Sequence, residues 1–243
     1  MNLLLLLTMV FPGQRFVNLP TGVLPESRVW QVVVSHRFLP AIVAPGWNQD
    51  PLRAFTGANV RVTLEKSLNE RWVVGISDAI SSRMLGLSAA YSPLPWLTVY
   101  PELNTHLYGF KLDSTWLNLG VCCHRTFGDQ VAVVAQPRLT TNTSRHFISL
   151  GLGAKWQVIE TWSVGLEAEP VLLGGNSATR QLAVSVTAEK HVGWHDFAIT
   201  LGTPREQTAP ALFLSPGPST PYSDVLDLLK GYFRVGFNLS RKI

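Results

Sequence analysis

Apolar and polar residues alternate with a period of two along most of the chain after residue 28. In residues 60–66, VRVTLEK, the apolar Val60, Val62 and Leu64 fall on one face and the polar residues on the other. Such alternation predicts β-strands, because successive side chains of a strand point to opposite sides. It recurs in twelve segments, at residues 28–38, 58–67, 71–79, 83–92, 96–105, 116–125, 130–140, 146–157, 161–171, 180–190, 195–203 and 231–242. Most of them are about as long as a tilted strand that crosses a bilayer.

The connections between these segments alternate between short and longer ones. Short connections lie near residues 68–70, 93–95, 126–129, 158–160 and 191–194. The others lie at residues 39–57, 80–82, 106–115, 141–145, 172–179 and 204–230, of which 80–82 is unusually brief. Short periplasmic turns and longer extracellular loops are typical of outer-membrane barrels with an even strand number. We therefore predict an all-β fold, an up-and-down antiparallel transmembrane β-barrel of about twelve strands.

The less apolar face of the predicted strands is rich in small residues. In residues 148–155, ISLGLGAK, that face carries serine, two glycines and a lysine. Small and polar residues suit a crowded, partly wet barrel interior, while the opposite face of Leu, Val, Ile and Ala suits lipid. A soluble periplasmic or surface β-protein is the alternative, but its exposed strand faces should carry more Lys and Glu.

Tryptophans gather close to the short connections. Those within a few residues of a short turn are Trp72, Trp96, Trp156, Trp162 and Trp194. Aromatic residues form girdles where the wall of a membrane barrel meets the water interface. We expect these five to form such a girdle at one rim; the alternative is strand-end packing in a soluble core.

Charge and cysteine content exclude other classes of protein. The net charge is +4, but the 20 basic residues are scattered, which argues against a nucleic-acid partner. The two cysteines are neighbours, so a disulfide does not hold the fold. The apolar start, MNLLLLLTMVF, predicts a degenerate export signal over residues 1–13, with a misassigned start or a buried strand as alternatives. Residues 14–27 then form a periplasmic or plug segment, and residues 28–243 form the barrel.

Several stretches resemble an uncharacterised family of bacterial outer-membrane-type β-barrel proteins. They are RFVNLPTGVLPESRVWQVVVSHRF (15–38), GANVRVTLEKSLNERWVVGI (57–76), HDFAITLGTPREQTAPALFLSPG (195–217) and GYFRVGFNLSR (231–241). The SHRF-type first strand and the GFNLSR last strand carry the resemblance most clearly. It implies a barrel in the outer membrane of a Gram-negative-type bacterium and implies no activity. The chain departs from the family by ending in Ile243 rather than in an aromatic residue.

Charged residues on the predicted inward face are the leading candidates for a functional site. By strand parity they are Arg37, Arg61, Glu65, Glu102, Arg138, Lys155, Glu167, Glu169, Glu189 and Arg234. In one interpretation the arginines face the glutamates across a narrow pore and orient polar solutes. In the other, the charges form ion pairs that brace a closed barrel, since an unpaired buried charge is costly.

Two further motifs carry weaker chemical signals. Cys122 and His124 share a face in CCHR, but two ligands are too few for a structural metal site, and we expect neither metal nor cofactor. Ser144 and His146 lie in TNTSRH, which leaves an outer-membrane hydrolase with a rim site as an alternative function. No nucleophile-elbow motif surrounds them, so we expect no catalysis.

The longest predicted connection, residues 204–230, contains an apolar stretch between prolines. It folds into the lumen as a plug, binds a protein partner, or packs as an ordinary loop. The sequence thus predicts a narrow channel for small polar solutes or a structural or interaction barrel, with outer-membrane lipid around it.

Overall fold

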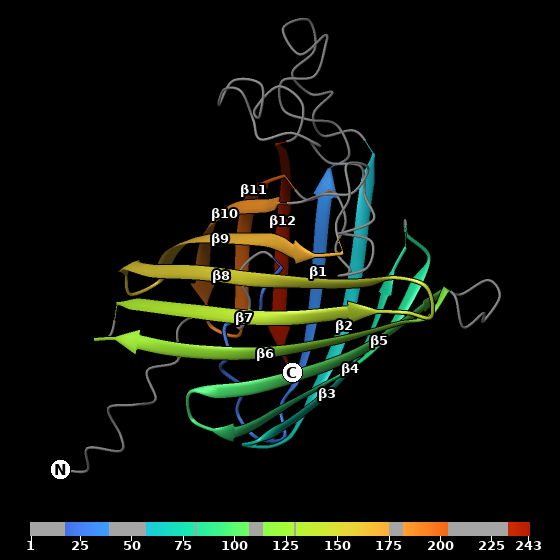
Figure 1. Ribbon diagram of the computed structural model, residues 1–243. Helices are drawn as coiled ribbons and strands as arrows, with labels where there is room; N and C mark the ends of the chain where they lie inside the picture. Colours follow the sequence, from blue (N-terminus) through green and yellow to red (C-terminus); the bar gives the residue numbers. More distant parts are fainter. Residues whose placement is uncertain are drawn as a thin grey trace, which may run out of the picture.

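The computed structural model describes residues 18–38, 57–80, 82–106, 114–128, 130–174, 182–203 and 233–243. These residues form twelve β-strands arranged as one closed barrel (Figure 1). The strands are β1 (Trp30–Phe38), β2 (Ala58–Asn69), β3 (Trp72–Ala79), β4 (Met84–Leu94), β5 (Leu97–His106), β6 (Trp116–Phe127), β7 (Val131–Thr141), β8 (His146–Ile159), β9 (Trp162–Leu173), β10 (Leu182–Val192), β11 (His195–Gly202) and β12 (Arg234–Lys242). The predicted export signal, residues 1–13, and the loop 204–230 lie outside the described residues.

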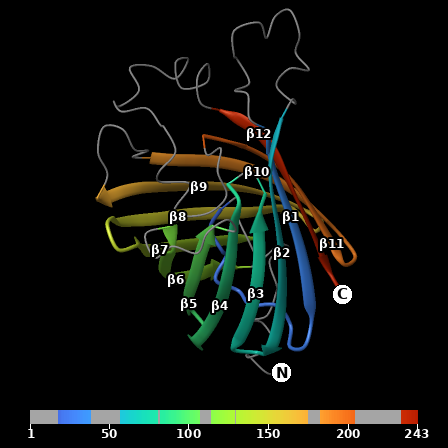
Figure 2. The ribbon, with the colours of Figure 1, turned by 90° about the vertical axis from the view of Figure 1, so that its right-hand side faces the viewer.

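Each strand pairs with its neighbours in sequence, and β12 closes the ring against β1. All twelve pairings are antiparallel, and the closing one places His36 opposite Phe237. Figure 2 shows β1 and β12 side by side after a quarter turn of the molecule. The predicted all-β, up-and-down barrel with an even strand number is therefore confirmed.

The first strand begins slightly later than its alternation predicts. The predicted segment starts at residue 28, whereas β1 starts at Trp30. Arg28 has a φ of 66°, a left-handed conformation that an extended strand does not contain. Its backbone N–H still donates to the carbonyl of Ser67 at 3.1 Å, so the chain joins the sheet through a turn-like residue.

Tight turns lie at one end of the barrel, which we call the short-turn end; the opposite end is the loop end. The turns of the short-turn end join β2 to β3, β4 to β5, β6 to β7, β8 to β9 and β10 to β11. In the first of them, the Asn69 side-chain oxygen accepts hydrogen bonds from the backbone N–H groups of Arg71 at 2.9 Å and Trp72 at 3.0 Å. An asparagine that caps its own turn in this way explains why the chain reverses here.

Burial in the barrel is reversed relative to a soluble protein. Among the described residues, 27 buried side chains are polar or charged and 14 are apolar. Large apolar side chains instead cover the outside, with Leu87 52%, Leu152 44% and Ile199 69% exposed. Soluble proteins bury apolar residues preferentially, so this pattern is typical of a barrel whose wall faces lipid. No helix with the length and apolar character of a membrane span occurs in the described part of the chain.

Candidate functional site: the barrel interior

The ten charged residues predicted for the lumen lie on the interior side of their strands. Seven are buried, namely Arg37, Arg61, Glu65, Lys155, Glu167, Glu169 and Glu189. Glu102, Arg138 and Arg234 are partly buried and bind other interior groups. Five acids and five bases thus share the interior, and most lie within reach of an opposite charge or of backbone groups.

The most deeply buried ion pair joins two strands that are not neighbours. The Nζ of Lys155 on β8 lies 2.9 Å from the carboxylate of Glu189 on β10. The strand between them, β9, presents Gly165 opposite Lys155. Because glycine has no side chain, the lysine can pass over β9 and reach the next strand. The pair therefore braces three consecutive strands.

A second ion pair spans a wider part of the wall. The guanidinium of Arg61 on β2 pairs with the carboxylate of Glu102 on β5 and donates to Ser77 Oγ on β3 at 2.9 Å. Gly86 on β4 lies beneath the pair, where an added Cβ would approach Ser77 Oγ to 2.5 Å and Glu102 Oε1 to 3.2 Å. Small inward residues on β3 and β4 thus make room for this long contact.

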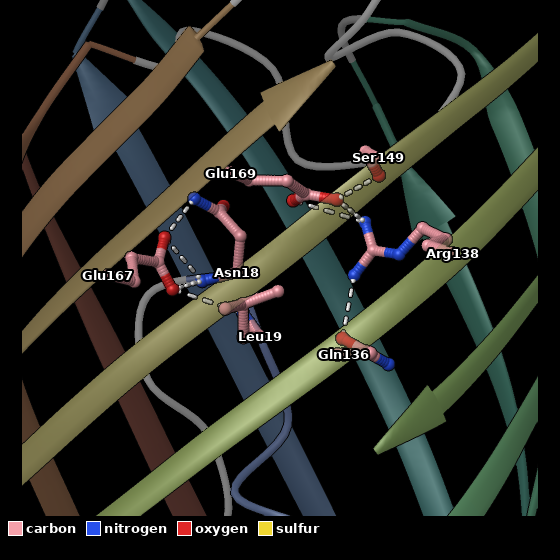
Figure 3. A network of polar contacts seen from close by, with 7 residues as sticks. All are labelled: Asn18, Leu19, Gln136, Arg138, Ser149, Glu167 and Glu169. Atoms are coloured by element: carbon pink, nitrogen blue, oxygen red, sulfur yellow. Dashed lines mark hydrogen bonds and ion pairs between the residues drawn. The ribbon is translucent and has the colours of Figure 1, made fainter. Parts of the chain in front are cut away.

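A third pair connects β7 with β9 (Figure 3). Arg138 lies 3.2 Å from a carboxylate oxygen of Glu169 and also donates to Gln136 Oε1 at 3.2 Å. The hydroxyl of Ser149, on the intervening β8, donates to the same carboxylate at 2.7 Å. The carboxylate is therefore satisfied by a charge and a hydroxyl within a buried network.

The remaining predicted arginines bind backbone carbonyls and amides. Arg37 donates to the carbonyl of His36 at 2.8 Å and to Asn238 Oδ1 at 2.9 Å. Arg234 donates to the carbonyl of Thr203 at 3.4 Å. Three of the predicted bases, on β2, β7 and β8, are thus paired with acids on β5, β9 and β10, and these contacts favour bracing over a transverse field.

Glu167 differs from the other interior acids in its partners. Its carboxylate accepts the backbone N–H groups of Asn18, at 2.9 Å, and of Leu19, at 3.1 Å. The side-chain amide of Asn18 donates to the same carboxylate at 2.6 Å. Figure 3 shows Asn18 and Leu19 lying against β9, beside the Arg138–Glu169 network. The segment before β1 therefore lies inside the barrel.

An apolar cluster lies among the polar residues at the loop end of the interior. Buried Trp116 and Phe147 stack there with their ring centroids 6.0 Å apart. They join a cluster with Ala79, Met84 and Ala183, which come from strands on different sides of the ring. Strand parity also predicts inward positions for Trp116 and Phe147, on the same strand faces as the polar residues.

One interior acid escaped the sequence analysis. Asp196 on β11 pairs with the His191 ring of β10 and accepts the hydroxyl of Ser240 on β12 at 2.8 Å. Its inward orientation could have been predicted from the alternation, because the apolar Phe197 and Ile199 fall on the opposite face of the strand. The side chain of Asp196 links three strands in the same manner as the longer pairs.

The CCHR motif serves packing in this structure. Cys122 is fully buried, and its thiol donates to the carbonyl of Pro20 at 3.9 Å. The ring of His124 lies against Gly22. Among the described residues, no three potential metal ligands of the His, Cys, Asp or Glu type lie together.

The TNTSRH sequence forms a compact turn at the loop end. Asn142 Oδ1 accepts the backbone N–H groups of Ser144 at 2.9 Å and Arg145 at 2.7 Å. The ring of His146 hydrogen-bonds to the hydroxyl of Thr141. The hydroxyl that contacts the His146 ring is therefore that of Thr141.

Five tryptophans lie at or near the short-turn end with their rings on the outside. Their exposed fractions range from 40% to 62%, for Trp72, Trp96, Trp156, Trp162 and Trp194. The ring of Trp162 lies 5.3 Å from the Nζ of Lys190, so an apolar ring and a cation meet at this rim. The aromatic girdle predicted from these residues stays a prediction.

No protein-family model matches the chain, and no curated protein matches it in sequence. Solved structures match it in fold. The KdgM porin is 10% identical, with 88% of this chain and 99% of the porin covered and a TM-score of 0.55. The fold is that of outer-membrane β-barrels.

Two further structures agree with this result. The NanC porin is 8% identical, with coverages of 88% and 100% and a TM-score of 0.54. The COG4313 outer membrane channel from Pseudomonas putida F1 is 14% identical, with coverages of 96% and 100% and a TM-score of 0.52. Identities this low show the fold alone. Membership of the family marked by SHRF and GFNLSR stays a prediction.

Proposed function

We propose that the protein is an outer-membrane channel for small polar solutes, with a narrow path through the barrel interior. The observation that carries the proposal is the reversal of polarity across the wall. Apolar side chains cover the outside, while acids, bases, amides and hydroxyls line the inside. A polar interior enclosed by an apolar wall is the arrangement that carries polar solutes through lipid.

The location in the outer membrane is supported by the same reversal and by the likeness in fold to outer-membrane barrels. The five exposed tryptophans of the short-turn end suit a girdle at one membrane surface. With this orientation, the short-turn end faces the periplasm and the loop end faces outward. Outer-membrane lipid is then the principal partner of the wall, and the loop 204–230 is a candidate site for a protein partner.

A narrow path is supported by the size and filling of the barrel. Twelve strands lie between eight-stranded barrels, which side chains fill, and sixteen-stranded porins, which leave an open channel. The ion pairs that cross the inside of the wall, such as Lys155 with Glu189, take up further space. Solutes of the size of a monosaccharide or an amino acid are the class that such a path suits.

Uptake into proteoliposomes tests this function. Vesicles that contain the folded full chain should swell in isotonic solutions of small polar solutes, at rates that fall steeply with solute size. Empty vesicles are the control. Glu167→Gln weakens the bonds that hold residues 18 and 19 inside the barrel, so this variant is measured as well. If folded, inserted barrels of both the wild-type chain and Glu167→Gln cause no swelling, the channel proposal is overturned.

A further inference from the structure

Residues 18–29 cross the barrel interior before β1 begins. The segment is bonded to Glu167 of β9 near its start, to Thr98 of β5 in its middle, and to Ser67 of β2 at its end. Strands β9 and β2 lie on opposite sides of the ring. Figure 1 shows this blue coil within the ring of strands. The segment therefore lies across the path that a solute would take.

The start of the segment is held by charge-assisted hydrogen bonds. The Glu167 carboxylate receives two backbone N–H groups and one side-chain amide, from Asn18 and Leu19. Backbone N–H groups that point at a carboxylate bind it strongly in a buried environment. A charged residue of the wall is thus used to hold a piece of main chain.

The wall is also shaped to receive one side chain of the segment. Leu19 is fully buried and packs with Cys122 and Val134, with Tyr100 beside them. A Cβ on Gly151 would lie 2.6 Å from the Leu19 Cδ2 atom. The glycine therefore leaves the space that the leucine side chain fills.

The middle of the segment fits the wall through main-chain contacts. Gly22 has a φ of 84°, and a Cβ at this position would overlap the His124 ring. The Gly22 carbonyl accepts the Thr98 hydroxyl at 2.8 Å, and the carbonyl of Pro20, two residues earlier, accepts the Cys122 thiol. Only glycine combines this backbone angle with so close an approach.

We propose that residues 18–25 are a tethered plug, which binds a peptide-shaped site in the lumen and closes the channel until the plug leaves. The site consists of Glu167, Gly151, Cys122, Thr98 and His124. This inference rests on the proposed channel function, because it names the element that regulates the path. The plug remains attached through the start of β1, so release and rebinding are intramolecular.

The contacts of the plug suit reversible binding. Leu19 is the one fully buried large apolar side chain of the plug, while Val23 and Leu24 are only half-buried. The bonds to Glu167 and Thr98 are hydrogen bonds that water can replace. Glu169, two residues from Glu167 on the same strand, is instead paired with Arg138. Of these two acids, Glu167 is the one whose main-chain partners leave with the plug.

Labelling of Cys122 measures plug release independently of conductance. In the Cys123→Ser chain, reconstituted and folded, a water-soluble methanethiosulfonate should react slowly with Cys122, which is fully buried. Glu167→Gln should raise the labelling rate and the open probability in planar bilayers by about tenfold or more, since hydrogen bonds to a charged group are among the stronger ones. Leu19→Ala should act in the same direction.

Glu169→Gln is the matched control, because it makes the same chemical change at the next inward position of β9. It should leave the labelling rate of Cys122 at its wild-type value, since Glu169 binds Arg138 and Ser149 rather than the plug. A rise equal to that of Glu167→Gln would indicate general loosening of the barrel and would overturn the plug.

The outcomes separate the plug from the channel. Conductance by the wild-type chain, with Cys122 labelling and open probability unchanged in Glu167→Gln and Leu19→Ala, would overturn the plug and leave the channel standing. Faster labelling in both variants without any current would support release of the segment but contradict the channel. Faster labelling together with a higher open probability is the result that the proposal predicts.

Discussion

Lys155 and Glu189 form a buried ion pair across an intervening strand, with 2.9 Å between the ammonium and a carboxylate oxygen. The pair lies over the inward glycine of β9. It shows how this barrel encloses charge: long side chains of opposite sign meet across strands whose own inward residues are small.

Loss of one partner should be costly for stability. Lys155→Met leaves the Glu189 carboxylate buried without its cation, and we expect the free energy of unfolding to fall by about 3–5 kcal/mol. The double variant Lys155→Met/Glu189→Gln should recover most of that loss, because no uncompensated charge remains. Denaturant unfolding of the barrel in lipid or detergent measures both values.

The ion pair of Lys242 with the exposed Glu26 is the control. Their charged atoms lie 3.5 Å apart, and the Glu26 side chain is 61% exposed. Glu26→Gln should therefore change the free energy of unfolding by less than about 1 kcal/mol. A double variant at 155 and 189 that is as unstable as Lys155→Met would contradict the pairing argument.

The outward face of β8 tests the lipid environment of the wall. Leu152 lies near the middle of the strand and Ile159 ends it, and both side chains are exposed. An arginine in place of Leu152 should cost about 2–4 kcal/mol in a bilayer, and in place of Ile159 about 1 kcal/mol or less. Equal costs at the two positions would count against a membrane-spanning orientation.

Gly86 should be intolerant of larger side chains. Gly86→Val places atoms between Ser77 and Glu102, and we expect a loss of about 1–3 kcal/mol in unfolding free energy from overpacking. Ala89→Val, on the outward face of the same strand, should change stability far less. The prediction fails if the two variants unfold at the same denaturant concentration.

Lipid contact of the tryptophans can be measured by fluorescence quenching. Brominated lipids should quench the emission of Trp162, which is 40% exposed, but not that of Trp116, which is 5% exposed in the interior. Trp162→Phe should thus remove part of the quenchable emission, and Trp116→Phe should remove unquenched emission. Shallow bromine positions should act more strongly on Trp162 than deep ones. The reverse pattern would exclude a girdle at the short-turn end.

The strands could be predicted because alternation is a local property of the sequence. The predicted segment 146–157, for example, matches β8 with an end two residues longer. The inward orientation of a side chain can also be predicted from the local alternation, because their positions alone place Glu167 and Glu169 on the same face of the strand. Neither observation requires knowledge of any long-range contact.

The partners of the charged residues could not be predicted in the same way. Arg61 finds Glu102 three strands away, which depends on register and on the small residues between them. For residues 14–27 the sequence left a periplasmic and a plug position open. The contacts of residues 18–29 could not be predicted, because the segment has no periodicity and its anchor on Glu167 joins positions 149 residues apart. Such contacts form only when the ring closes. The alternation predicts that the strands form a closed ring, but it does not predict which side chains then meet inside it.

The central claim is that a polar path for solutes runs through the barrel interior. Single-channel recording, with each of the two native cysteines retained in turn, tests this claim most directly. Cys122 points inward and Cys123 lies on the outward face of β6, so chains that retain only one of them differ in which side of the wall carries the thiol. The account predicts discrete current steps from both chains. A charged thiol reagent should reduce the current through the chain with Cys122 and leave the current through the chain with Cys123 unchanged. Folded, inserted barrels that pass no current even when Glu167→Gln is added to release the plug, or currents of those variants that are insensitive at both positions, would contradict a polar path through the interior.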